Sequence, residues 1–389
     1  MNVPETPQAK AQDEREDKPR YGVDPYLDWL GGEGIPVTED YGVDLFAVDT
    51  APWPRYGGVN GAAVHLKSRG DFANMFLFDI RPGRSTAPQR HLYEEVVYVL
   101  EGHGSTQLEF ADGGRRSFEW GEKSLFAIPL NAKNRHFNGS GTERALLVST
   151  TNLPMIMNVF HSEDFVFACD FDFRERAGKR EYFSGEGNLI TVRPGNHMWE
   201  TNFVPDLTAI ELKSWGDRGA GGTNIMFVLA DGTMHAHISE MPVGTYKKAH
   251  RHGPSFHVMC VMGQGFSLLW YEHEKDFHRI DWKHGIVLVP ADRQFHQHFN
   301  TGPAPARYLA TAVGGLRYPS LRAQRVSLLG ASENDAPAVS KSVKDGGDQI
   351  EYEDQDPRIH RIWLEEMRRN GATPRMEKYI PTPAEMKAG

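Results

Sequence analysis

The sequence predicts an all-β protein made of two tandem barrels, with a short helix before the first barrel and another after the second. Three observations support this prediction: short apolar runs separated by turn residues, a repeat of one half of the chain in the other, and helical patterns confined to the two ends. With 389 residues, 39% of them hydrophobic, the chain is long enough to bury two cores.

The lead-in to the first barrel is expected to span residues 1–59. Its first twenty residues are mostly polar and charged, and they are predicted to be disordered. A short helix is predicted in DPYLDWLGG, because Asp24 can cap the first turn and Pro25 suits the first helical position. Gly31 and Gly32 are expected to end this helix.

Two regions, 60–166 and 225–328, are predicted to be the barrels. Each contains short apolar or alternating runs separated by glycine, proline, asparagine and aspartate, which is typical of antiparallel sheets. Examples are ANMFLFDI, EVVYVL and SLFAIP in the first region, and NIMFVLA, HVMCVM and GIVLVP in the second. Residues 167–224 are expected to connect the two barrels.

Residues 329–389 are predicted to form a polar tail that closes with a helix. In DPRIHRIWLEEMRRNGA, Asp356 and Pro357 open the helix and Gly371 ends it. An apolar stripe is expected along one side, and we expect it to pack on the barrels or on a second subunit. The stripe consists of Ile359, Ile362, Trp363 and Met367.

The second half of the chain repeats the first. The stretch PGRSTAPQRHLYEEVVYVLEGHG matches VGTYKKAHRHGPSFHVMCVMGQG at an offset of 161 residues. Further on, NRHFN matches HQHFN at an offset of 162, each after a tryptophan and thirteen intervening residues. A change of one residue is a single loop insertion, so the chain is predicted to be a duplicated β-domain.

Composition excludes several classes of protein. The formal net charge is −9 and the lysines and arginines are scattered, so a nucleic acid is not expected as a partner. No apolar stretch is long enough to span a bilayer and the N-terminus does not resemble a signal peptide, so we expect a cytoplasmic protein without membrane contact. The chain has only two cysteines, Cys169 and Cys260, so any metal must be held by nitrogen and oxygen atoms.

The matched segments resemble the two motifs of the cupins. The first of these motifs has a glycine, then H-x-H, then a glutamate three or four residues on and a further glycine. The second has a proline, a histidine and, four residues past it, an asparagine. Both halves resemble cupin domains, over roughly 85–140 and 245–302, so the whole chain resembles a bicupin. The resemblance implies two double-stranded β-helix, or jelly-roll, barrels with a metal site in the mouth.

The resemblance also implies which residues bind the metal. In the second half the ligands fall on His250, His252 and His296, and Phe256 occupies the position where many members have glutamate. In the first half two of the four positions hold good ligands, so this site is degraded and a structural role is expected. The four positions are Gln89, His91, Glu95 and Asn134. A hydrogen-bonded polar network inside this barrel is expected from Gln89, His91, Glu95 and His136.

Strand geometry supports the second-half site independently. His250 and His252 are two residues apart, so in a β-strand their side chains point to the same face. His296 comes from a distant strand, and three imidazoles on one side of an ion leave positions open for a substrate and a small molecule. A divalent ion held by three neutral nitrogens keeps its full positive charge, which favours an anionic bidentate substrate.

Among bicupins, an all-histidine site without the glutamate, together with the HxHxN second motif, resembles the gentisate and salicylate ring-cleaving dioxygenases. This resemblance implies ferrous iron, a hydroxylated aromatic acid bound through its hydroxyl and carboxylate, and dioxygen as the second substrate. Manganese, nickel and zinc are the alternative metals. In that family the intact site belongs to the first barrel, whereas here it is in the second, so the sequence predicts the metal chemistry more firmly than the substrate.

Two other functions remain open. One is a non-oxidative decarboxylase, lyase or isomerase of an oxygenated acid, in which the ion polarises a carbonyl or stabilises an enolate. Bicupin decarboxylases typically keep the glutamate in both barrels, and Phe256 and Gln89 depart from that pattern. The other is a non-catalytic barrel that binds a small molecule. Cupins commonly pair through their barrels, so a homodimer or larger homo-oligomer is expected.

Two further histidines are candidates for catalytic roles. His298 shares a face with His296 if that segment is extended, and it is either a base or substrate contact or a residue that only lines the site. His257 is a candidate fourth ligand or catalytic group. If Phe256 is the match to Glu95, however, strand alternation turns His257 to the opposite face, between the barrel and its neighbour.

Four other residues are weaker candidates. Tyr246 and Lys248 have the parity of the ligand pair and are predicted to hold a substrate carboxylate, with a solvated lysine at a strand start as the alternative for Lys248. His235 and His237 form another H-x-H, and no partner occurs for them at a cupin position. We expect them to be strand-face histidines rather than ligands.

Overall fold

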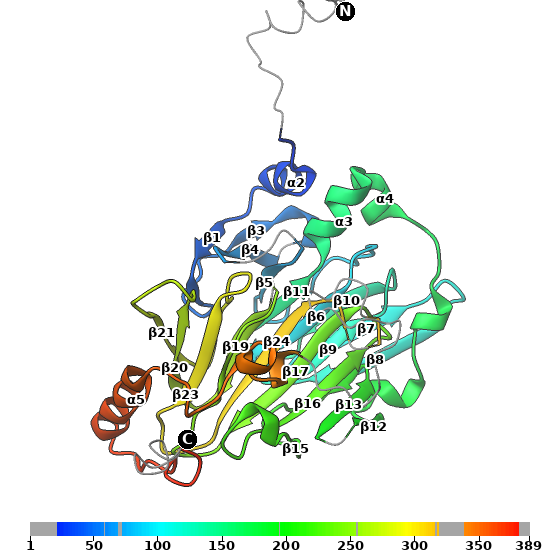
Figure 1. Ribbon diagram of the computed structural model, residues 1–389. Coiled ribbons are helices and arrows are strands. Elements are labelled where there is room, and N and C mark those ends of the chain that lie inside the picture. The colour runs from blue at the N-terminus through cyan, green and yellow to red at the C-terminus, as the bar shows by residue number, and fades with distance from the viewer. Residues whose placement is uncertain are drawn as a thin grey trace, which may run out of the picture.

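The computed structural model describes residues 22–57, 59–68, 72–193, 195–253, 256–315, 317–318 and 338–380. In these residues the chain forms two β-barrels that lie against each other, each made of one large and one small sheet (Figure 1). The predicted charged leader and most of the polar stretch expected after the second barrel lie outside the described residues. So does the predicted end of that barrel at residue 328.

Barrel 1 is built mainly from eight strands. In chain order they are β4 (Val59–Leu66), β5 (Asn74–Ile80), β6 (Glu95–Glu101), β7 (Gly104–Glu109), β8 (Arg115–Trp120), β9 (Leu125–Ile128), β10 (Lys133–Asn138) and β11 (Ala145–Thr151). The large sheet has the order β4-β5-β11-β6-β9, and the small sheet has the order β10-β7-β8. Single bridges from Ser85 to Phe137 and from Gln89 to Asn134 extend the small sheet beyond β10. Strands β1 (Val37–Asp40) and β3 (Ala51–Trp53) pair with β4.

Barrel 2 repeats this arrangement. Its strands are β16 (Thr223–Leu229), β17 (Met234–Met241), β18 (Ala249–His250), β19 (His257–Met262), β20 (Gln264–Trp270), β21 (His278–Lys283), β22 (Ile286–Leu288), β23 (Phe295–Asn300) and β24 (Ala306–Val313). The large sheet has the order β16-β17-β24-β19-β22, and the small sheet has the order β21-β20-β23-β18. At the β16 edge β12 (Asn188–Arg193), β13 (Asn196–Thr201) and β15 (Lys213–Ser214) extend the large sheet.

The strand order of the two barrels confirms the predicted jelly-roll fold. We number the strands of each barrel from 1 to 8, beginning at β5 or at β17 and counting the bridged segment 85–89 as the second strand of barrel 1. The large sheet then reads 1-8-3-6 and the small sheet reads 2-7-4-5 in both barrels, which is the order of a jelly roll. Gly102 and Gly263, which the repeat aligns, both have a positive φ, 87° and 86°, where a side chain would be strained.

The helices at the two ends form as predicted, with one correction. Helix α2 (Pro25–Glu33) is capped by Asp24, whose Oδ1 accepts the Leu27 N–H at 3.0 Å. The prediction that Gly31 and Gly32 end this helix is wrong: the backbone stays helical through both glycines and turns at Gly34, whose φ is 69°. A helix ends at a residue in the left-handed conformation, whereas a glycine inside the helix only weakens the helix.

The C-terminal helix α5 (Pro357–Arg369) packs on the small sheet of barrel 2. Its predicted stripe faces inward, with Ile359, Trp363 and Met367 buried. The indole of Trp363 lies 5.0 Å from the ring of Tyr246, and its Nε1 donates to the Asn300 carbonyl at 3.0 Å. Just before the helix, β25 (Gln349–Ile350) pairs with β18 and so supports the strand that carries His250.

Two helices were not expected. They are α3 (Leu153–Phe160) and α4 (Glu163–Ala168), and they follow β11 within the region predicted to be barrel 1. Pro154 suits the first turn of α3, and the Ser162 hydroxyl accepts the Phe165 N–H at 3.2 Å to start α4. These two short helices lie beside α2 at the far end of barrel 1 (Figure 1).

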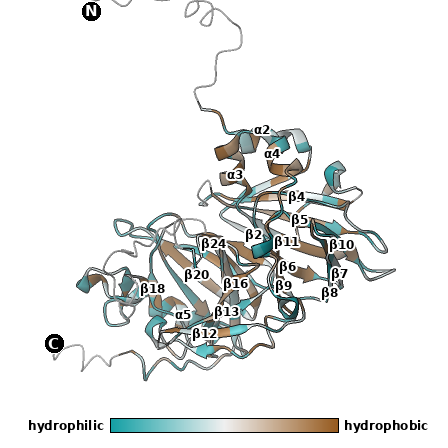
Figure 2. Cartoon of the chain, turned by 90° about the vertical axis from the view of Figure 1, so that its right-hand side faces the viewer, coloured by the Kyte–Doolittle hydropathy of each residue, from teal (hydrophilic) through white to brown (hydrophobic). Residues whose placement is uncertain are grey.

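The large sheets of the two barrels pack face to face. Their facing strands carry hydrophobic stretches (Figure 2). At this contact Thr311 donates a hydrogen bond to Thr150 at 3.0 Å, and the two residues are 161 apart, so repeated positions touch each other. The apolar core between the sheets includes Val64, Met75, Leu77, Tyr98 and Val148 of barrel 1, and Ile225, Phe227, Ile238, Met259 and Leu309 of barrel 2.

Each barrel also receives a strand from outside its own segment. Strand β2 (Gly42–Asp44), which precedes barrel 1, pairs with β22 of barrel 2. Strand β14 (Phe203–Val204), which lies in the connection between the barrels, pairs with β9 of barrel 1. The lead-in and the connection are therefore parts of the two sheets rather than independent linkers.

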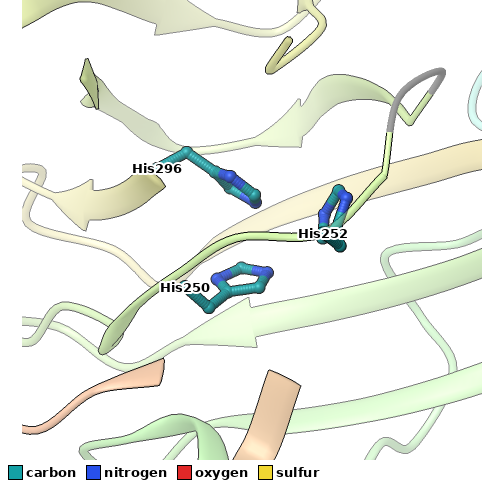
Figure 3. A group of neighbouring side chains, drawn as sticks. All are labelled: His250, His252 and His296. Atoms are coloured by element: carbon teal, nitrogen blue, oxygen red, sulfur yellow. The ribbon is translucent and has the colours of Figure 1, made fainter. Parts of the chain in front are cut away.

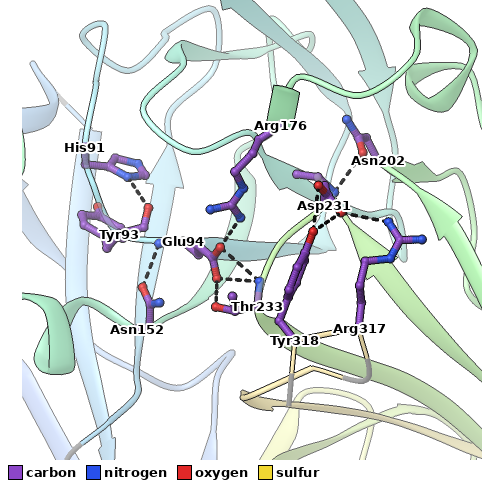
Figure 4. Close-up of polar contacts among 11 residues, drawn as sticks. His91, Tyr93, Glu94, Asn152, Arg176, Asn202, Asp231, Thr233, Arg317 and Tyr318 are labelled. Carbon is purple, nitrogen blue, oxygen red and sulfur yellow. Dashed lines mark hydrogen bonds and ion pairs between the residues drawn. The ribbon is translucent and has the colours of Figure 1, made fainter. Parts of the chain in front are cut away.

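A buried carboxylate joins the barrels through polar contacts. Glu94, at the start of β6, accepts the backbone N–H of Thr233 from barrel 2 at 2.9 Å and also contacts the Thr233 hydroxyl and Arg176 (Figure 4). The Glu94 N–H donates to the Asn152 side chain at 2.7 Å. Because its charge is met on several sides, this carboxylate fixes the position of the turn between β16 and β17.

Candidate metal centre

Three histidines come together inside barrel 2. His250 lies on β18, His252 follows two residues later, and His296 lies opposite His250 on β23 (Figure 3). Each offers one ring nitrogen, and these nitrogens all lie within 4.8 Å of one another. All three side chains are buried. We refer to these residues as the three-histidine cluster.

The spacing of the cluster fits a single ion. The ring centroids are 4.1 Å apart for His250 and His296, 4.6 Å for His252 and His296, and 5.2 Å for His250 and His252. Metal–nitrogen distances of about 2.1 Å let the ligands of one ion lie up to about 4 Å apart. Small side-chain rotations are therefore enough to bring the three nitrogens into one coordination sphere.

Backbone carbonyls orient two of the three rings. The Nδ1 atom of His252 lies 2.7 Å from the Gly253 carbonyl oxygen, and that of His296 lies 3.2 Å from the Gln294 carbonyl oxygen. A carbonyl only accepts, so each Nδ1 carries the proton and each Nε2 has a lone pair. This is the usual arrangement of histidines that bind a metal through Nε2. The buried Nδ1 of His250 has no hydrogen-bond partner among the described residues.

The electrostatics of the cluster keep the His250 and His296 rings neutral. Burial lowers the pKa of His250 well below its ordinary value, and the nearby Arg218 cation and the other cluster rings lower it further. Burial also lowers the pKa of His296, together with its neighbours His252 and His298. Neutral imidazoles with available lone pairs are the form that binds a cation.

His298 lies next to the cluster, and its ring contacts a relay formed by Ser267 and Trp282. Its ring is 5.5 Å from that of His296, and its Nδ1 lies 2.8 Å from the Ser267 hydroxyl. The Ser267 oxygen also accepts the Trp282 Nε1–H at 2.9 Å, and its own proton is free to point at His298 Nδ1. In that arrangement His298 carries its proton on Nε2. Burial, followed by the Lys247 cation, lowers its pKa to about 3, so it is neutral.

Barrel 1 keeps the relay but not the cluster. Trp120 Nε1–H donates to the Thr106 hydroxyl at 2.9 Å, and that hydroxyl lies 2.8 Å from His136 Nδ1. The position of the cluster, however, is occupied by an ion pair, in which His91 Nε2 lies 3.0 Å from Glu95 Oε1. Burial acts to raise the pKa of Glu95, but the hydrogen bonds from His91 and Ser149 and the nearby His91 and His136 rings together outweigh it, so the pKa is lowered.

Gln89 and Asn134 hold the other two cluster positions in barrel 1, and both bind the backbone. Gln89 Nε2 donates to the Arg55 carbonyl at 2.9 Å and to the Ala87 carbonyl at 3.2 Å. Asn134 Nδ2 lies 3.4 Å from the Ala132 carbonyl. In the described residues the grouping of three potential ligands occurs in barrel 2 and has no counterpart in barrel 1.

The interiors of the two barrels differ in polarity beyond these motifs. In barrel 1, Phe78 pairs with Leu147 across β5 and β11, and both belong to an apolar core. At the same place in barrel 2, Ser239 pairs with Tyr308 across β17 and β24. His237 of barrel 2 stands where barrel 1 has Phe76. Barrel 1 is thus filled by its own side chains, whereas barrel 2 presents polar groups beside the cluster.

His257 is not part of the three-histidine cluster. It begins β19 opposite Thr311 of β24, at the contact between the two barrels, and it is fully buried. It lies on the same side of β19 as Met259, which belongs to the core between the barrels. Phe256 instead lies against the cluster, with its ring 4.4 Å from that of His252.

Tyr246 and Lys248 do not reach the cluster either. The Tyr246 ring lies in the apolar layer under α5, and its hydroxyl contacts His360 Nδ1 at 3.1 Å. Lys248 forms an ion pair with Glu351 of the C-terminal tail. The expected alternation fails because the strand is interrupted at Lys248, whose backbone N–H bonds Arg218 instead of β23.

The interruption turns Lys247 inward, and sequence reasoning missed this residue. Its side chain is 3% exposed, and its Nζ lies 5.3 Å from the centre of the Tyr308 ring. Tyr308 in turn lies 4.8 Å from the His298 ring, so Lys247 is close to the cluster side of the barrel. Burial and then the Arg218 cation lower the pKa of Lys247 to about 7.

His235 and His237 lie on β17, and they contact each other rather than the cluster. His235 Nε2 is 2.7 Å from His237 Nδ1, and the His235 ring is 5.2 Å from that of Phe256. Phe256 therefore separates this pair from His252. Burial, with His235 and Lys247 as the next causes, lowers the pKa of His237 well below its ordinary value.

The fold and this cluster define a protein of two jelly-roll barrels, one of which contains three histidines arranged for a metal ion. No protein-family model matches the chain, and no curated protein matches it. No helix in the described residues has the length and apolar character needed to cross a bilayer.

The solved structures that are similar to this chain include oxalate decarboxylases. A mutant of the Bacillus subtilis enzyme has a TM-score of 0.47 and 12% identity, covering 81% of this chain and 85% of that chain. The Lactobacillus farciminis enzyme in complex with formate has a TM-score of 0.47 and 13% identity, covering 70% and 86%. At these identities the comparison does not bear on the substrate of this chain.

Proposed function

We propose that barrel 2 is the active site of a metal-dependent enzyme that converts a small oxygenated carboxylic acid. The observation that carries this proposal is the buried three-histidine cluster, in which His250 and His296 are neutral and backbone carbonyls orient His252 and His296. His250, His252 and His296 would hold a divalent ion, with ferrous iron and manganese as the first ions to test and nickel and zinc as alternatives. Bound there, the ion would act as a Lewis acid that polarises an oxygen of the substrate.

The reaction class that the surrounding residues fit best is non-oxidative: a decarboxylation, lyase or isomerase reaction. Such reactions place negative charge on a substrate oxygen, and a fixed hydrogen-bond donor stabilises that charge. We propose that His298 is such a donor, with the Ser267 hydroxyl, which accepts from Trp282, donating to its Nδ1 and so leaving its proton on Nε2 beside the cluster. With its lone pair engaged by Ser267, His298 would donate to the substrate rather than accept from it.

A second candidate is a dioxygenase of a hydroxylated aromatic acid. Two observations favour it: the cluster contains imidazoles without a carboxylate, and the Phe256 ring lies 4.4 Å from the His252 ring. An aromatic side chain at this position offers a stacking surface to an aromatic substrate. The chain has no glutamate there, so the charge of the ion is left for an anionic ligand.

The experiment that tests the proposal combines metal analysis with turnover in the presence and absence of oxygen. Protein purified anaerobically is analysed for bound metals, reloaded with iron or manganese, and incubated with hydroxylated aromatic acids and with short oxo-, hydroxy- and dicarboxylic acids. Turnover under nitrogen, with release of carbon dioxide or isomerisation, supports the non-oxidative reaction. Oxygen uptake that depends on the acid supports the dioxygenase. A protein that binds none of these metals contradicts both.

A further inference from the structure

Lys247 is a buried basic side chain, partly protonated at pH 7, for which the described residues supply no anion. In the described part of the chain no hydrogen bond or ion pair involves its ammonium, and its contact is the face of the Tyr308 ring at 5.3 Å. Burying a charge without a partner is costly, because the charge loses its hydration. The acidic group that acts on it, Glu240, is already paired with Arg307 at 2.6 Å.

The second cation of this region does not have the same need. Arg218 is buried, and its Nη1 donates to the Val339 carbonyl at 2.5 Å and to Gln349 Oε1 at 3.1 Å. Arg218 is therefore held by the chain itself. Lys247, next to it, adds positive charge to the same region. Its ammonium has three N–H donors, and none has a hydrogen-bond partner among the described residues.

The duplication shows that this lysine belongs to the barrel that has the cluster. The repeat aligns Lys247 with Thr86, and the structure confirms the match: the Thr86 N–H donates to the His136 carbonyl at 2.9 Å, and the Lys247 N–H donates to the His298 carbonyl at 3.1 Å. In barrel 1 the Thr86 hydroxyl turns back and accepts the His136 N–H at 2.9 Å. In barrel 2 the same backbone position carries a long side chain that extends into the interior.

A continuous row of side chains leads from this ammonium to the cluster. The Tyr308 ring that Lys247 contacts lies 4.8 Å from the His298 ring, and the His298 ring lies 5.5 Å from that of His296. The charged groups that act on Lys247 are the Arg218 cation and the Glu240 carboxylate, which is paired with Arg307. Tyr308, His298 and His237 lie beside it and are neutral at pH 7. An anion that reached this row would meet a net positive field.

We propose that Lys247 binds the carboxylate of a small organic acid whose other oxygens are directed at the three-histidine cluster. The substrate of barrel 2 is then an acid with two separate parts. Lys247 binds one carboxylate, and a second group binds the metal or is transformed. The assignment rests on the proposed function for the cluster. Binding of the carboxylate by Lys247 does not itself require the metal, so the two proposals can be tested separately.

The test is the binding of two anions, salicylate and malonate, to metal-free protein by isothermal titration calorimetry at pH 7. We compare the wild type with Lys247→Thr, which installs the residue of the first repeat. The control is Lys248→Thr, which removes the neighbouring lysine that is paired with Glu351. We expect the wild type and the control to bind at least one anion with equal affinity, and Lys247→Thr to bind it about tenfold or more weakly.

A neutral analogue separates loss of the charge contact from a change in shape. Salicylamide and malonamide lack the carboxylate charge, so they should bind the wild type more weakly than the acids do, and this difference should vanish in Lys247→Thr. Equal anion affinity in the wild type and Lys247→Thr overturns the proposal, and so does a wild type that binds neither anion. If Lys247→Thr does not fold, Lys247→Met is compared in the same way.

Metal loading of the same proteins distinguishes this proposal from the one on which it rests. Both Lys247→Thr and the wild type should take up iron or manganese equally, because the variant leaves the cluster unchanged. A wild type that binds anions through Lys247 but takes up no metal would contradict the metal site and leave the carboxylate site standing. A protein that takes up metal but binds anions independently of Lys247 would contradict the carboxylate site and leave the metal site standing.

Discussion

Acid should destabilise this protein well above the pH at which carboxylates titrate, because its barrels bury neutral histidines. Burial lowers the pKa of His136 to about 4 and that of His298 to about 3, whereas an exposed histidine has a pKa of about 6.5. Between pH 6.5 and these folded values the unfolded chain binds a proton at each site and the folded chain does not. Stability is therefore complete above about pH 6.5 and falls as the pH falls through this window.

The size of the effect follows from the shifts. A pH of 5 is about 1.5 units below the unfolded pKa of each of the two histidines, and it is still above their folded pKa values. Each should therefore cost ~2 kcal/mol of unfolding free energy relative to pH 8, or ~4 kcal/mol together. His250, His296 and His237, whose pKa values are also lowered by burial, add to this loss. The total is a large part of the ~5–15 kcal/mol typical of a folded protein.

The assay is urea unfolding followed by tryptophan fluorescence at several values between pH 8 and pH 5, with a chelator present so that metal binding does not contribute. His136→Gln should remove ~2 kcal/mol of the pH dependence, and substitution of the exposed His103 should leave it unchanged. A free energy of unfolding that stays constant to within ~1 kcal/mol between pH 8 and pH 5 would refute the reasoning. It would mean that these rings are protonated in the folded protein or reach water.

Three substitutions test other parts of the structure. Trp363→Ala should destabilise the protein by ~3–5 kcal/mol in urea unfolding at pH 8. Leu364→Ala, at an exposed position of the same helix, should cost less than ~1 kcal/mol. Similar losses from the two variants would show that α5 is not anchored by its buried face. Glu94→Gln should cost ~1.5–3 kcal/mol in the same assay, because it weakens the charged contacts between the barrels, and an unchanged midpoint would contradict the role of this carboxylate. In Ser267→Ala the His298 tautomer should no longer be fixed, which nitrogen-15 NMR of the ring detects, and an unchanged Nε2–H signal would argue against the relay.

Strand patterns and the internal repeat were enough to predict the two barrels. The apolar runs became β5, β6, β9, β16, β19 and β22, and the offset of 161 residues became a repeated strand order. The convergence of His250, His252 and His296 could also be predicted, because residues two apart on a strand share a face and the second motif supplies the opposite strand. These predictions depend on local periodicity, which tertiary contacts reinforced here.

Features that depend on irregular backbone could not be predicted in this way. The alternation rule assigned Lys248 to the interior, but the strand breaks at that residue and Lys247 points inward instead. The break is caused by a hydrogen bond from the Lys248 N–H to the Arg218 carbonyl, thirty positions earlier in the chain. This contact has no signature in the local sequence. The prediction that α2 ends at Gly31 and Gly32 was wrong for a similar reason, because helix propensity alone does not locate the left-handed residue that ends a helix.

One signal in the sequence would have revealed the different interiors of the barrels. Extending the repeat alignment beyond the two motifs pairs Phe76 with His237 and Leu147 with Tyr308. Each pair replaces an apolar residue of the first barrel by a polar one in the second. A duplicated domain that has kept its strands but changed the polarity of one interior indicates which copy carries a ligand.

The central claim is that three imidazole nitrogens of barrel 2 hold one divalent ion, and the metal content of a matched pair of variants tests it most directly. His250→Ala removes a cluster ring, and Gln89→Ala changes the position that the repeat aligns with it in barrel 1. Structural metal sites with four ligands bind with a free energy of ~10–16 kcal/mol, so one ligand accounts for ~2.5–4 kcal/mol, or a loss of affinity of about two to three orders of magnitude. After dialysis against a weak chelator, mass spectrometry of bound metals should find one equivalent in the wild type and in Gln89→Ala, and almost none in His250→Ala. Full metal content in His250→Ala, or equal loss from both variants, would contradict the account.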